Sequence, residues 1–469
     1  MRTAQVLFAG IVASLVTHAD ARAQDRTPDS LFQQQRLIDQ KLADERSRRA
    51  PIDSLVDFQY GGWFDYYVFH FDDGSQQSRL FQRPGLAVWT RLRLDQGAHE
   101  FFARMRLTYN YFKRGDEIDR QQDWVGPNFD RAWYQVDVGR ALRLTDPSDP
   151  FQFQVRIGRQ EVQFGNGYVL DMPLDAVRFD ARLRDFRLTG LFAKTIASTP
   201  NVDRSPPVQG HSERNFFGVQ LTYEGLGDHE PFAYALWNQD HTRERPSAFL
   251  QEFDYDSQYF GVGSRGTFAR NLHYWTEWVY ETGHSFGDGA YIRRDVVDAW
   301  AWDVGLEYLF DHEMHPRLAF EYMFASGDRD RQFSPTSAMG GNRNDRSDTS
   351  FVGFGFRDTG LSAAPVLSNI HVWRVGASFM PLRRVELFEH FELGTNWFLY
   401  YKNRRGAAIS DPTADRFSGY VGWEIDTFLN WRLSSDLSWT TRWGVFFPGK
   451  AYSDRDTRHF LLSGLTWSF

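Results

Sequence analysis

The stretch that decides the fold class is Tyr420–Arg432, which reads YVGWEIDTFLNWR. One set of alternate positions carries Val421, Trp423, Ile425, Thr427, Leu429 and Trp431, and the other set carries Gly422, Glu424, Asp426, Phe428, Asn430 and Arg432. Successive side chains of a β-strand point to opposite faces. The spacing therefore predicts a strand with one apolar face and one charged face.

The same alternation recurs from Val56 to the end of the chain, in segments that are commonly ten or more residues long, which is unusual for soluble proteins. We expect about 18 strands, near residues 56–70, 79–94, 99–113, 129–140, 151–162, 174–182, 184–194, 213–225, 230–239, 254–266, 269–282, 296–311, 315–326, 369–380, 383–402, 419–432, 436–448 and 458–469. Alternation alone also fits a half-buried strand of a soluble secreted enzyme or adhesin.

The connections between these segments favour a membrane barrel. Tight turns such as Thr267–Phe268 alternate with longer loops such as Thr195–Ser212 and Gly327–Ser368. Short turns at one rim, long loops at the other and an even strand count are typical of outer-membrane barrels. We expect an all-β fold, an antiparallel up-and-down transmembrane β-barrel that closes because lipid cannot satisfy an open sheet edge. The lipid bilayer is then its first partner.

Composition excludes several other classes. A formal charge of −8 argues against a nucleic-acid partner. A mean hydropathy of −0.52 excludes a bundle of transmembrane helices. The chain has no cysteine, which excludes thiol catalysis and Cys-ligated metals. Only five of its 53 basic residues are lysine, and the other 48 are arginine. Arginine favours bidentate recognition of carboxylates.

The N-terminus has the order of a secretory signal peptide: Arg2, the apolar stretch Val6–Val16, then the small residues around Ala23. We expect residues 1–23 to be removed, residues 24–54 to form a helical periplasmic segment, and residues 55–469 to form the barrel in a bacterial outer membrane. The aromatic last strand ends on Phe469, which resembles the C-terminal signature that the outer-membrane insertion machinery recognises.

If the apolar faces contact lipid, the charged faces line the lumen. Strand parity then predicts a substrate pathway of lumenal arginines, namely Arg91, Arg93, Arg104, Arg106, Arg131, Arg156, Arg178 and Arg187. The later strands contribute lumenal counter-charges, namely Glu277, Asp303, Glu307, Glu424 and Asp426. Two interpretations remain open: a salt-bridge lattice that fills the barrel, or an electropositive path that selects anions.

Several short motifs resemble the bacterial alginate export family of outer-membrane barrels. They are VRIGRQEVQFG at Val155–Gly165, AVRFD at Ala176–Asp180, Ser326–Asp328, Ser368–Ile370, the Gly422-x-Glu424-x-Asp426 spacing and Phe447–Gly449. The resemblance implies a monomeric 18-stranded barrel with an arginine-rich lumen that passes an anionic polyuronate outward. It also adds Arg159 to the pathway. The turns on the periplasmic side are short here, so the loop from Gly327 to Ser368 is the candidate plug.

We therefore expect a channel for an anionic polysaccharide or a related anionic solute. A general anion-selective or small-solute porin is the alternative, and a structural or anchoring barrel is the third possibility. No Ser, His and acid residues form a recognisable nucleophile setting, so we expect no enzyme, no cofactor and no metal site.

Overall fold

The computed structural model describes residues 55–72, 74, 78–114, 123–142, 151–202, 211–242, 254–285, 295–331, 334–337 and 347–469. The predicted signal peptide and the predicted helical segment at 24–54 lie outside the described residues. No helix in the described part of the chain is long and apolar enough to span a membrane.

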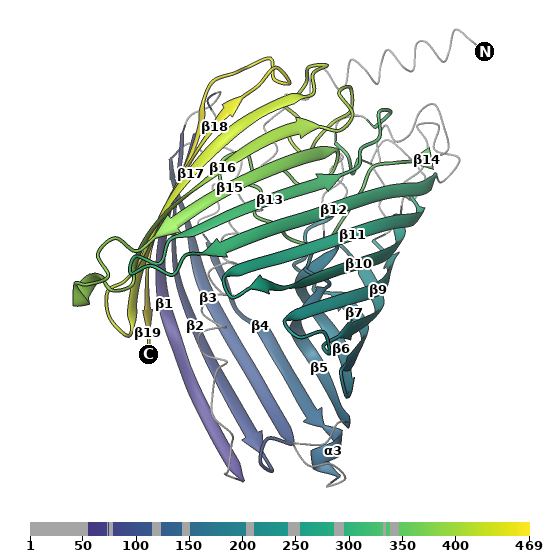
Figure 1. The fold of residues 1–469 in the computed structure, drawn as a ribbon, viewed down its shortest axis with the longest axis vertical. Helices are drawn as coiled ribbons and strands as arrows, with labels where there is room; N and C mark the ends of the chain where they lie inside the picture. Colours follow the sequence, from purple (N-terminus) through teal and green to yellow (C-terminus); the bar gives the residue numbers. More distant parts are fainter. Residues whose placement is uncertain are drawn as a thin grey trace.

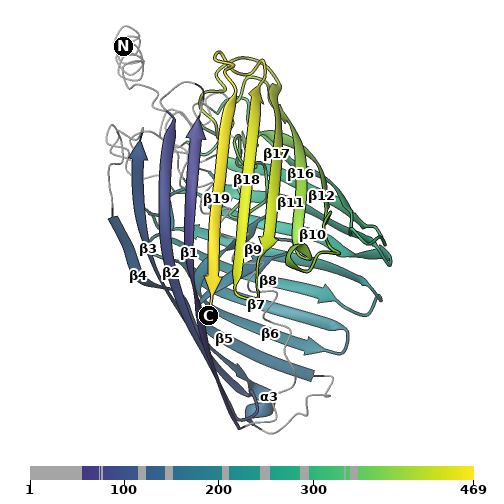
Figure 2. The same cartoon turned by 90° about the vertical axis from the view of Figure 1, so that its left-hand side faces the viewer.

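Eighteen long strands form one antiparallel sheet (Figures 1 and 2). They are β1 (Val56–Asp72), β2 (Arg79–Leu94), β3 (His99–Arg114), β4 (Asp123–Asp137), β5 (Phe151–Phe164), β6 (Leu170–Leu183), β7 (Phe186–Thr195), β8 (Arg214–Tyr223), β9 (His229–Asp240), β10 (Asp256–Ala269), β11 (Leu272–His284), β12 (Val296–Leu309), β13 (Arg317–Ala325), β15 (Ile370–Phe379), β16 (Phe391–Lys402), β17 (Tyr420–Arg432), β18 (Leu437–Pro448) and β19 (Arg458–Ser468). The short elements are α3 (Val138–Ala141), the 3₁₀ turn η1 (Glu386–Phe388) and the two-residue strand β14 (Ser347–Asp348), which pairs with β12 in parallel.

The sheet closes on itself. Strand β1 pairs with β19 from Trp63 opposite Ser468 to Asp72 opposite His459. Two backbone hydrogen bonds between Gly62 and Phe469, of 3.0 and 2.9 Å, continue the seam. Closure leaves no strand edge, which is what a sheet in hydrocarbon requires. The prediction of a closed antiparallel barrel of about 18 strands is confirmed.

The two faces of the strands differ as the alternation predicted. On β12, Trp300 and Trp302 are 43% and 41% exposed, whereas Ala299 and Ala301 beside them are fully buried. Short turns gather at one rim of the barrel and longer loops at the other. We call these the short-turn rim, which holds the C-terminus, and the long-loop rim; in barrels of this type the short turns face the periplasm.

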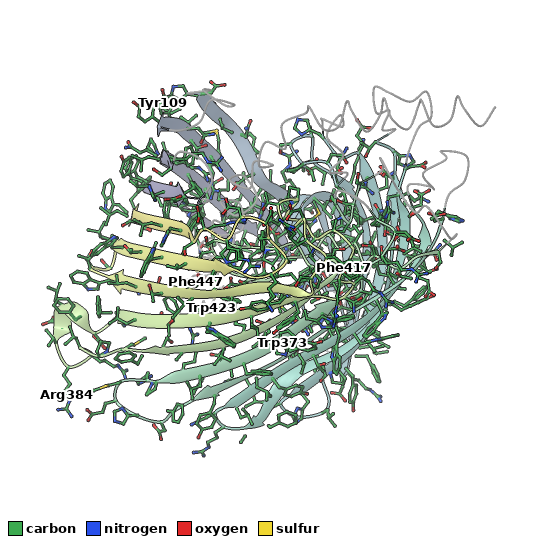
Figure 3. The ribbon with its side chains drawn as sticks, turned by 90° about the horizontal axis from the view of Figure 1, so that it is seen from above. Tyr109, Trp373, Arg384, Phe417, Trp423 and Phe447 are labelled. Carbon is green, nitrogen blue, oxygen red and sulfur yellow. The ribbon has the colours of Figure 1, made fainter. Side chains whose placement is uncertain are left out.

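Aromatic side chains mark both ends of the outer face. Near the long-loop rim, Trp423 of β17 stacks on Phe447 of β18 with ring centroids 4.2 Å apart, and Trp373 belongs to the same zone (Figure 3). Near the short-turn rim, Trp431 stacks on Phe388 with centroids 4.6 Å apart. Aromatic girdles of this kind lie at the two membrane–water interfaces.

Two segments from the long-loop rim fold into the barrel. We call residues 165–169, between β5 and β6, the inserted turn, and residues 349–369, which precede β15, the inserted loop. They bond to each other, because Phe354 N donates to Val169 O over 2.7 Å and Phe356 N donates to Gly167 O over 3.1 Å. The Phe354 ring also lies 5.0 Å from that of the inward-facing Phe216 on β8. Together they form a hydrophobic core inside the barrel.

Candidate functional site: the lumen wall

Eight of the predicted arginines lie on the inward faces of neighbouring strands from β2 to β7. They alternate with exposed apolar residues, and they share their faces with buried residues such as Ala87, Ala176 and Leu191. We call this set the arginine wall: Arg91, Arg93, Arg104, Arg106, Arg131, Arg156, Arg178 and Arg187.

Several of these guanidinium groups share their carboxylate partners. Arg91 and Arg93 both contact Glu100, at 3.0 and 3.4 Å. Arg104 and Arg106 both contact Asp130, at 2.6 and 3.8 Å. Each of these two carboxylates therefore serves two guanidinium groups of the wall.

Three further wall arginines pair with other acids. Arg131 pairs with Glu161, Arg178 with Asp180 at 2.8 Å, and Arg187 with Glu224 at 3.1 Å. Glu224 is shared in turn, because it also binds Arg182 at 2.8 Å. Sharing of carboxylates is thus a recurring feature of this side of the barrel.

Arg156 is held by a neutral group. Its Nε and Nη2 donate to the Gln135 amide oxygen over 2.8 and 2.5 Å. No carboxylate in the described part of the chain pairs with it. It lies directly opposite Arg178 in the register of β5 and β6. Two guanidinium groups on adjacent strands, only one of which has an acidic partner, leave positive charge at this point of the wall.

Aromatic rings lie between the arginines. Trp89, Phe102 and Trp133, from β2, β3 and β4, form a continuous row with centroid distances of 6.3 and 5.5 Å and nearly parallel planes. The Arg156 guanidinium carbon lies 4.2 Å from the Trp133 centroid, and that of Arg91 lies 5.6 Å from the Phe102 centroid. Such contacts fix the planes of the guanidinium groups without neutralising them.

The structure corrects the expectation for Arg159. Its neighbour two residues earlier, Ile157, is 50% exposed on the outer face, and the β5–β6 register runs through Gly158 without a shift. Arg159 therefore shares the outer face, where its Nε donates to the Asp175 carboxylate over 2.8 Å. Parity around Gly158 was ambiguous in the sequence, and the uninterrupted register resolves it.

The predicted counter-charges are also corrected, because three of them hold the inserted segments instead of the arginine wall. Glu424 on β17 accepts three backbone N–H bonds, from Leu361, Ser362 and Ala363, at 2.7, 2.6 and 2.7 Å. Asp303 on β12 binds Arg357 of the inserted loop at 2.8 Å.

Glu277 on β11 serves the inserted turn. It accepts the N–H of Asn166 and the hydroxyl of Tyr234, each over 2.6 Å. The other two acids make their bonds elsewhere: Glu307 pairs with Arg317 on β13 at 3.5 Å, and Asp426 shares a side-chain hydrogen bond with Glu424. The acids of β11, β12 and β17 are thus engaged on the far side of the lumen.

Three residues that hold the inserted segments were not predicted from the sequence. Glu281, four residues after Glu277 on the same face of β11, accepts the N–H of Val352 in the inserted loop over 2.9 Å. Parity alone would have found it. Arg357 and Tyr168 lie in connections, where no alternation signals direction; the Tyr168 hydroxyl donates to Phe324 O over 2.8 Å.

The environment keeps both connection residues in their usual protonation states. Burial by itself lowers the pKa of the Arg357 guanidinium, but the carboxylates of Asp303, Glu321 and Glu277 outweigh it and hold the pKa above its ordinary value. Burial, with the charge of Asp303 second, raises the pKa of the Tyr168 hydroxyl well above its ordinary value. Arg357 therefore stays charged and Tyr168 stays a hydrogen-bond donor across the physiological pH range.

A closed 18-stranded antiparallel barrel with an apolar outer face and a loop folded into its lumen is an outer-membrane protein of the porin or channel class. The sequence model of the alginate export family matches residues 73–460. The chain belongs to that family, as the motifs indicated. No curated protein matches the chain significantly.

Solved porin structures have the same fold. OccK8 (OprE) of Pseudomonas aeruginosa is 12% identical, with a TM-score of 0.54 over 88% of this chain and 98% of that one. OccK5 (OpdH) of the same organism is 12% identical, with a TM-score of 0.52 over the same shares. OccAB2 of Acinetobacter baumannii is 11% identical, with a TM-score of 0.54, again over 88% and 98%. Fold and family together indicate an outer-membrane location.

Proposed function

We propose that this barrel passes an anionic polysaccharide of the alginate type, a polyuronate, along the arginine wall. The observation that carries the proposal is the separation of charge across the lumen. On the wall of β2–β7, guanidinium groups share carboxylates and Arg156 is held by a neutral amide. The acids opposite are engaged with the inserted segments, namely Glu277, Glu281, Asp303 and Glu424.

The wall suits a chain of carboxylated sugars. Guanidinium groups bind carboxylates through paired, directional hydrogen bonds. Trp89, Phe102 and Trp133 offer apolar ring surface beside the arginines. Because each arginine already has a partner or a stacking contact, any one of them binds a passing carboxylate weakly. Many weak sites in series let a charged chain enter and also leave.

One observation favours a second candidate, an anion-selective porin for small solutes. The inserted loop contacts β11, β12 and β17 from within, and so narrows the passage. A narrow passage suits a short carboxylated solute. The two candidates share the arginine wall and differ in the size of what passes.

Planar-bilayer recordings of the refolded barrel test the proposal. We expect an anion-selective reversal potential and a current that polyuronate blocks. Replacing Arg104 and Arg106 by Gln should weaken both properties, and Arg159→Gln on the outer face is the matched control that should change neither. Block by short uronates but not by long chains would favour the small-solute porin. Cation selectivity, or an equal effect of Arg159→Gln, would overturn the arginine wall as the pathway.

A further inference from the structure

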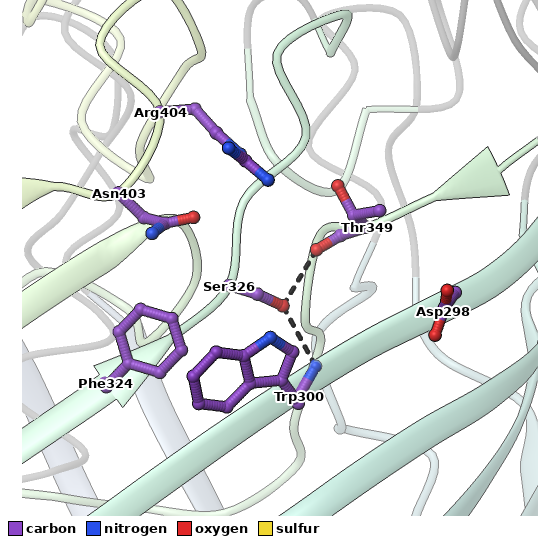
Figure 4. A pocket seen from close by; sticks show the side chains of 7 residues that line it. All are labelled: Asp298, Trp300, Phe324, Ser326, Thr349, Asn403 and Arg404. Carbon is purple, nitrogen blue, oxygen red and sulfur yellow. Dashed lines mark hydrogen bonds between the residues drawn. The ribbon is translucent and has the colours of Figure 1, made fainter.

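A pocket of about 320 Å³ lies on the outer face, at the long-loop ends of β12 and β13 (Figure 4). Trp300 and Asp298 line it from the lipid-facing side of β12. It is therefore separated from the lumen by the barrel wall, and it lies at the level of the aromatic girdle near the long-loop rim.

The floor of the pocket is aromatic and continues into the girdle. Trp300 packs on Phe324 with centroids 4.4 Å apart, and Phe324 packs on His371 at 4.7 Å. His371 in turn stacks on Trp373 at 5.7 Å. These rings form a row across the outer face of β12, β13 and β15, in which Trp300 is exposed and Phe324 is buried.

The rim of the pocket is polar and firmly built. Ser326 Oγ accepts the N–H of Trp300 over 3.0 Å and donates to Thr349 O over 2.8 Å. Asn403 accepts the N–H of Gly327 over 3.2 Å. These bonds tie the connections after β13 and β16 to one another, so the rim is preformed.

Arg404 supplies positive charge at this rim, above the aromatic floor (Figure 4). It is exposed, and the one side-chain hydrogen bond that it makes to a described residue is long, from Nε to Gly327 O at 3.4 Å. Within the ranges that the structure describes, no carboxylate pairs with it. Its two terminal nitrogens make no hydrogen bond to a described residue, and a guanidinium group of this kind can bind an anion bidentately.

We propose that this pocket binds the phosphorylated sugar headgroup of a glycolipid in the outer leaflet. An aromatic floor with hydroxyl and amide groups around it suits a sugar ring, and an exposed arginine that pairs with no described carboxylate suits a phosphate. The lipid-facing position selects a membrane lipid over a soluble sugar, because acyl chains can follow the exposed apolar residues Trp300, Trp302 and Leu306 along the outer face of β12. Asp298 repels phosphate, so the phosphate lies on the Arg404 side and Asp298 accepts a sugar hydroxyl.

Binding of fluorescent diphosphorylated lipid A to the refolded full-length barrel in detergent micelles tests this site. We expect Arg404→Gln to weaken binding by about tenfold or more, the loss typical of a charge-assisted hydrogen bond. Arg405→Gln is the matched control, because Arg405 is an exposed arginine next in the chain that does not line the pocket. Trp300→Leu, which leaves the charge intact, should also weaken binding.

Two competitors distinguish the source of the ligand. Glucosamine 1-phosphate, a soluble sugar phosphate, should displace lipid A poorly, and phosphatidylglycerol, an anionic lipid without a sugar ring, should do so no better. Complete displacement by either one would overturn the glycolipid assignment. Equal losses in Arg404→Gln and Arg405→Gln would overturn the pocket itself. Heat-dependent gel mobility confirms that each variant is a folded barrel before binding is measured.

Discussion

Glu424 holds the inserted loop by three backbone hydrogen bonds, and its removal should release that part of the loop from the lumen wall. The carboxylate lies fully buried on β17 and accepts the N–H groups of Leu361, Ser362 and Ala363 at 2.7, 2.6 and 2.7 Å. In Glu424→Ala these three N–H groups lose their acceptor while the loop stays docked. The docked state of the loop is therefore destabilised relative to an undocked state, in which water can accept these hydrogen bonds.

The size of the effect follows from the number of bonds. A buried donor left without its partner costs about 1–3 kcal/mol, so three of them cost at least about 3 kcal/mol. Since each 1.4 kcal/mol is a factor of ten, the ratio of undocked to docked loop should rise on the order of 100-fold. Glu424→Gln keeps one acceptor oxygen and should give a smaller rise.

Single-channel recording measures this directly as the frequency and size of openings. We expect Glu424→Ala to open more often and to a larger conductance than the wild type, with Glu424→Gln between them. Glu392→Gln is the control, because Glu392 bonds to Asn430 and Arg317 near the short-turn rim. If Glu424→Ala forms a folded barrel whose conductance and open probability equal those of the wild type, the loop does not limit the passage and the reasoning fails.

Three further predictions concern the lumen. Arg156→Gln should weaken block of the current by polyuronate about tenfold. The effect should exceed that of Arg178→Gln, because Arg178 already pairs with Asp180. Equal losses of block by the two variants, measured in bilayer recordings with increasing polyuronate, would contradict this. Asp303→Asn removes the hydrogen-bonded partner of Arg357 but leaves Glu321 and Glu277 nearby, so the free energy of unfolding should fall by about 1–3 kcal/mol, whereas an unchanged denaturation midpoint would refute the anchor. Block of the current by polyuronate should weaken as the salt concentration rises from 0.1 to 1 M, because the Debye length shortens about threefold. Block that does not change with salt concentration would exclude an electrostatic pathway.

The membrane makes the barrel predictable from the sequence. Lipid on one face and polar groups on the other impose a period of two on every strand, as on Trp300–Trp302 and on Glu424–Asp426. The prediction failed where that contrast reverses. Strand β6 begins at Leu170, four residues before the expected start at 174. This part of the strand still alternates, but its apolar residues Leu170, Met172 and Leu174 are buried on the inner face, where Leu170 pairs with Phe354 of the inserted loop. A pattern that expects the apolar face to be the outer one therefore does not mark the start of the strand.

The lumen site was predictable only in part, for a related reason. Parity gives the face of a strand residue, so Arg104 and Arg156 were assigned to the inner face from sequence alone, while Arg159 was misplaced where a glycine obscured the parity. Parity does not identify the residue with which a side chain pairs. The partners of Asp303 and Glu424 belong to a connection of more than 40 residues. A connection has no regular alternation of side chains, so the sequence predicts neither its path nor the way in which the Arg357 side chain points.

The engagement of the acids reconciles the proposed basic pathway with the acidic composition of the protein. The chain carries 61 acidic and 53 basic residues, so its overall charge predicts no attraction for anions. The field in a narrow lumen depends on nearby groups, because more distant exposed charges are screened within about 8–10 Å at moderate salt. Glu424 accepts hydrogen bonds from backbone N–H groups and Asp303 pairs with Arg357, on the wall opposite Arg156 and Arg178. An anion near the arginine wall therefore meets guanidinium groups at contact distance. The acidic residues that make the total charge negative include Glu424 and Asp303, which lie across the lumen and bind the inserted loop.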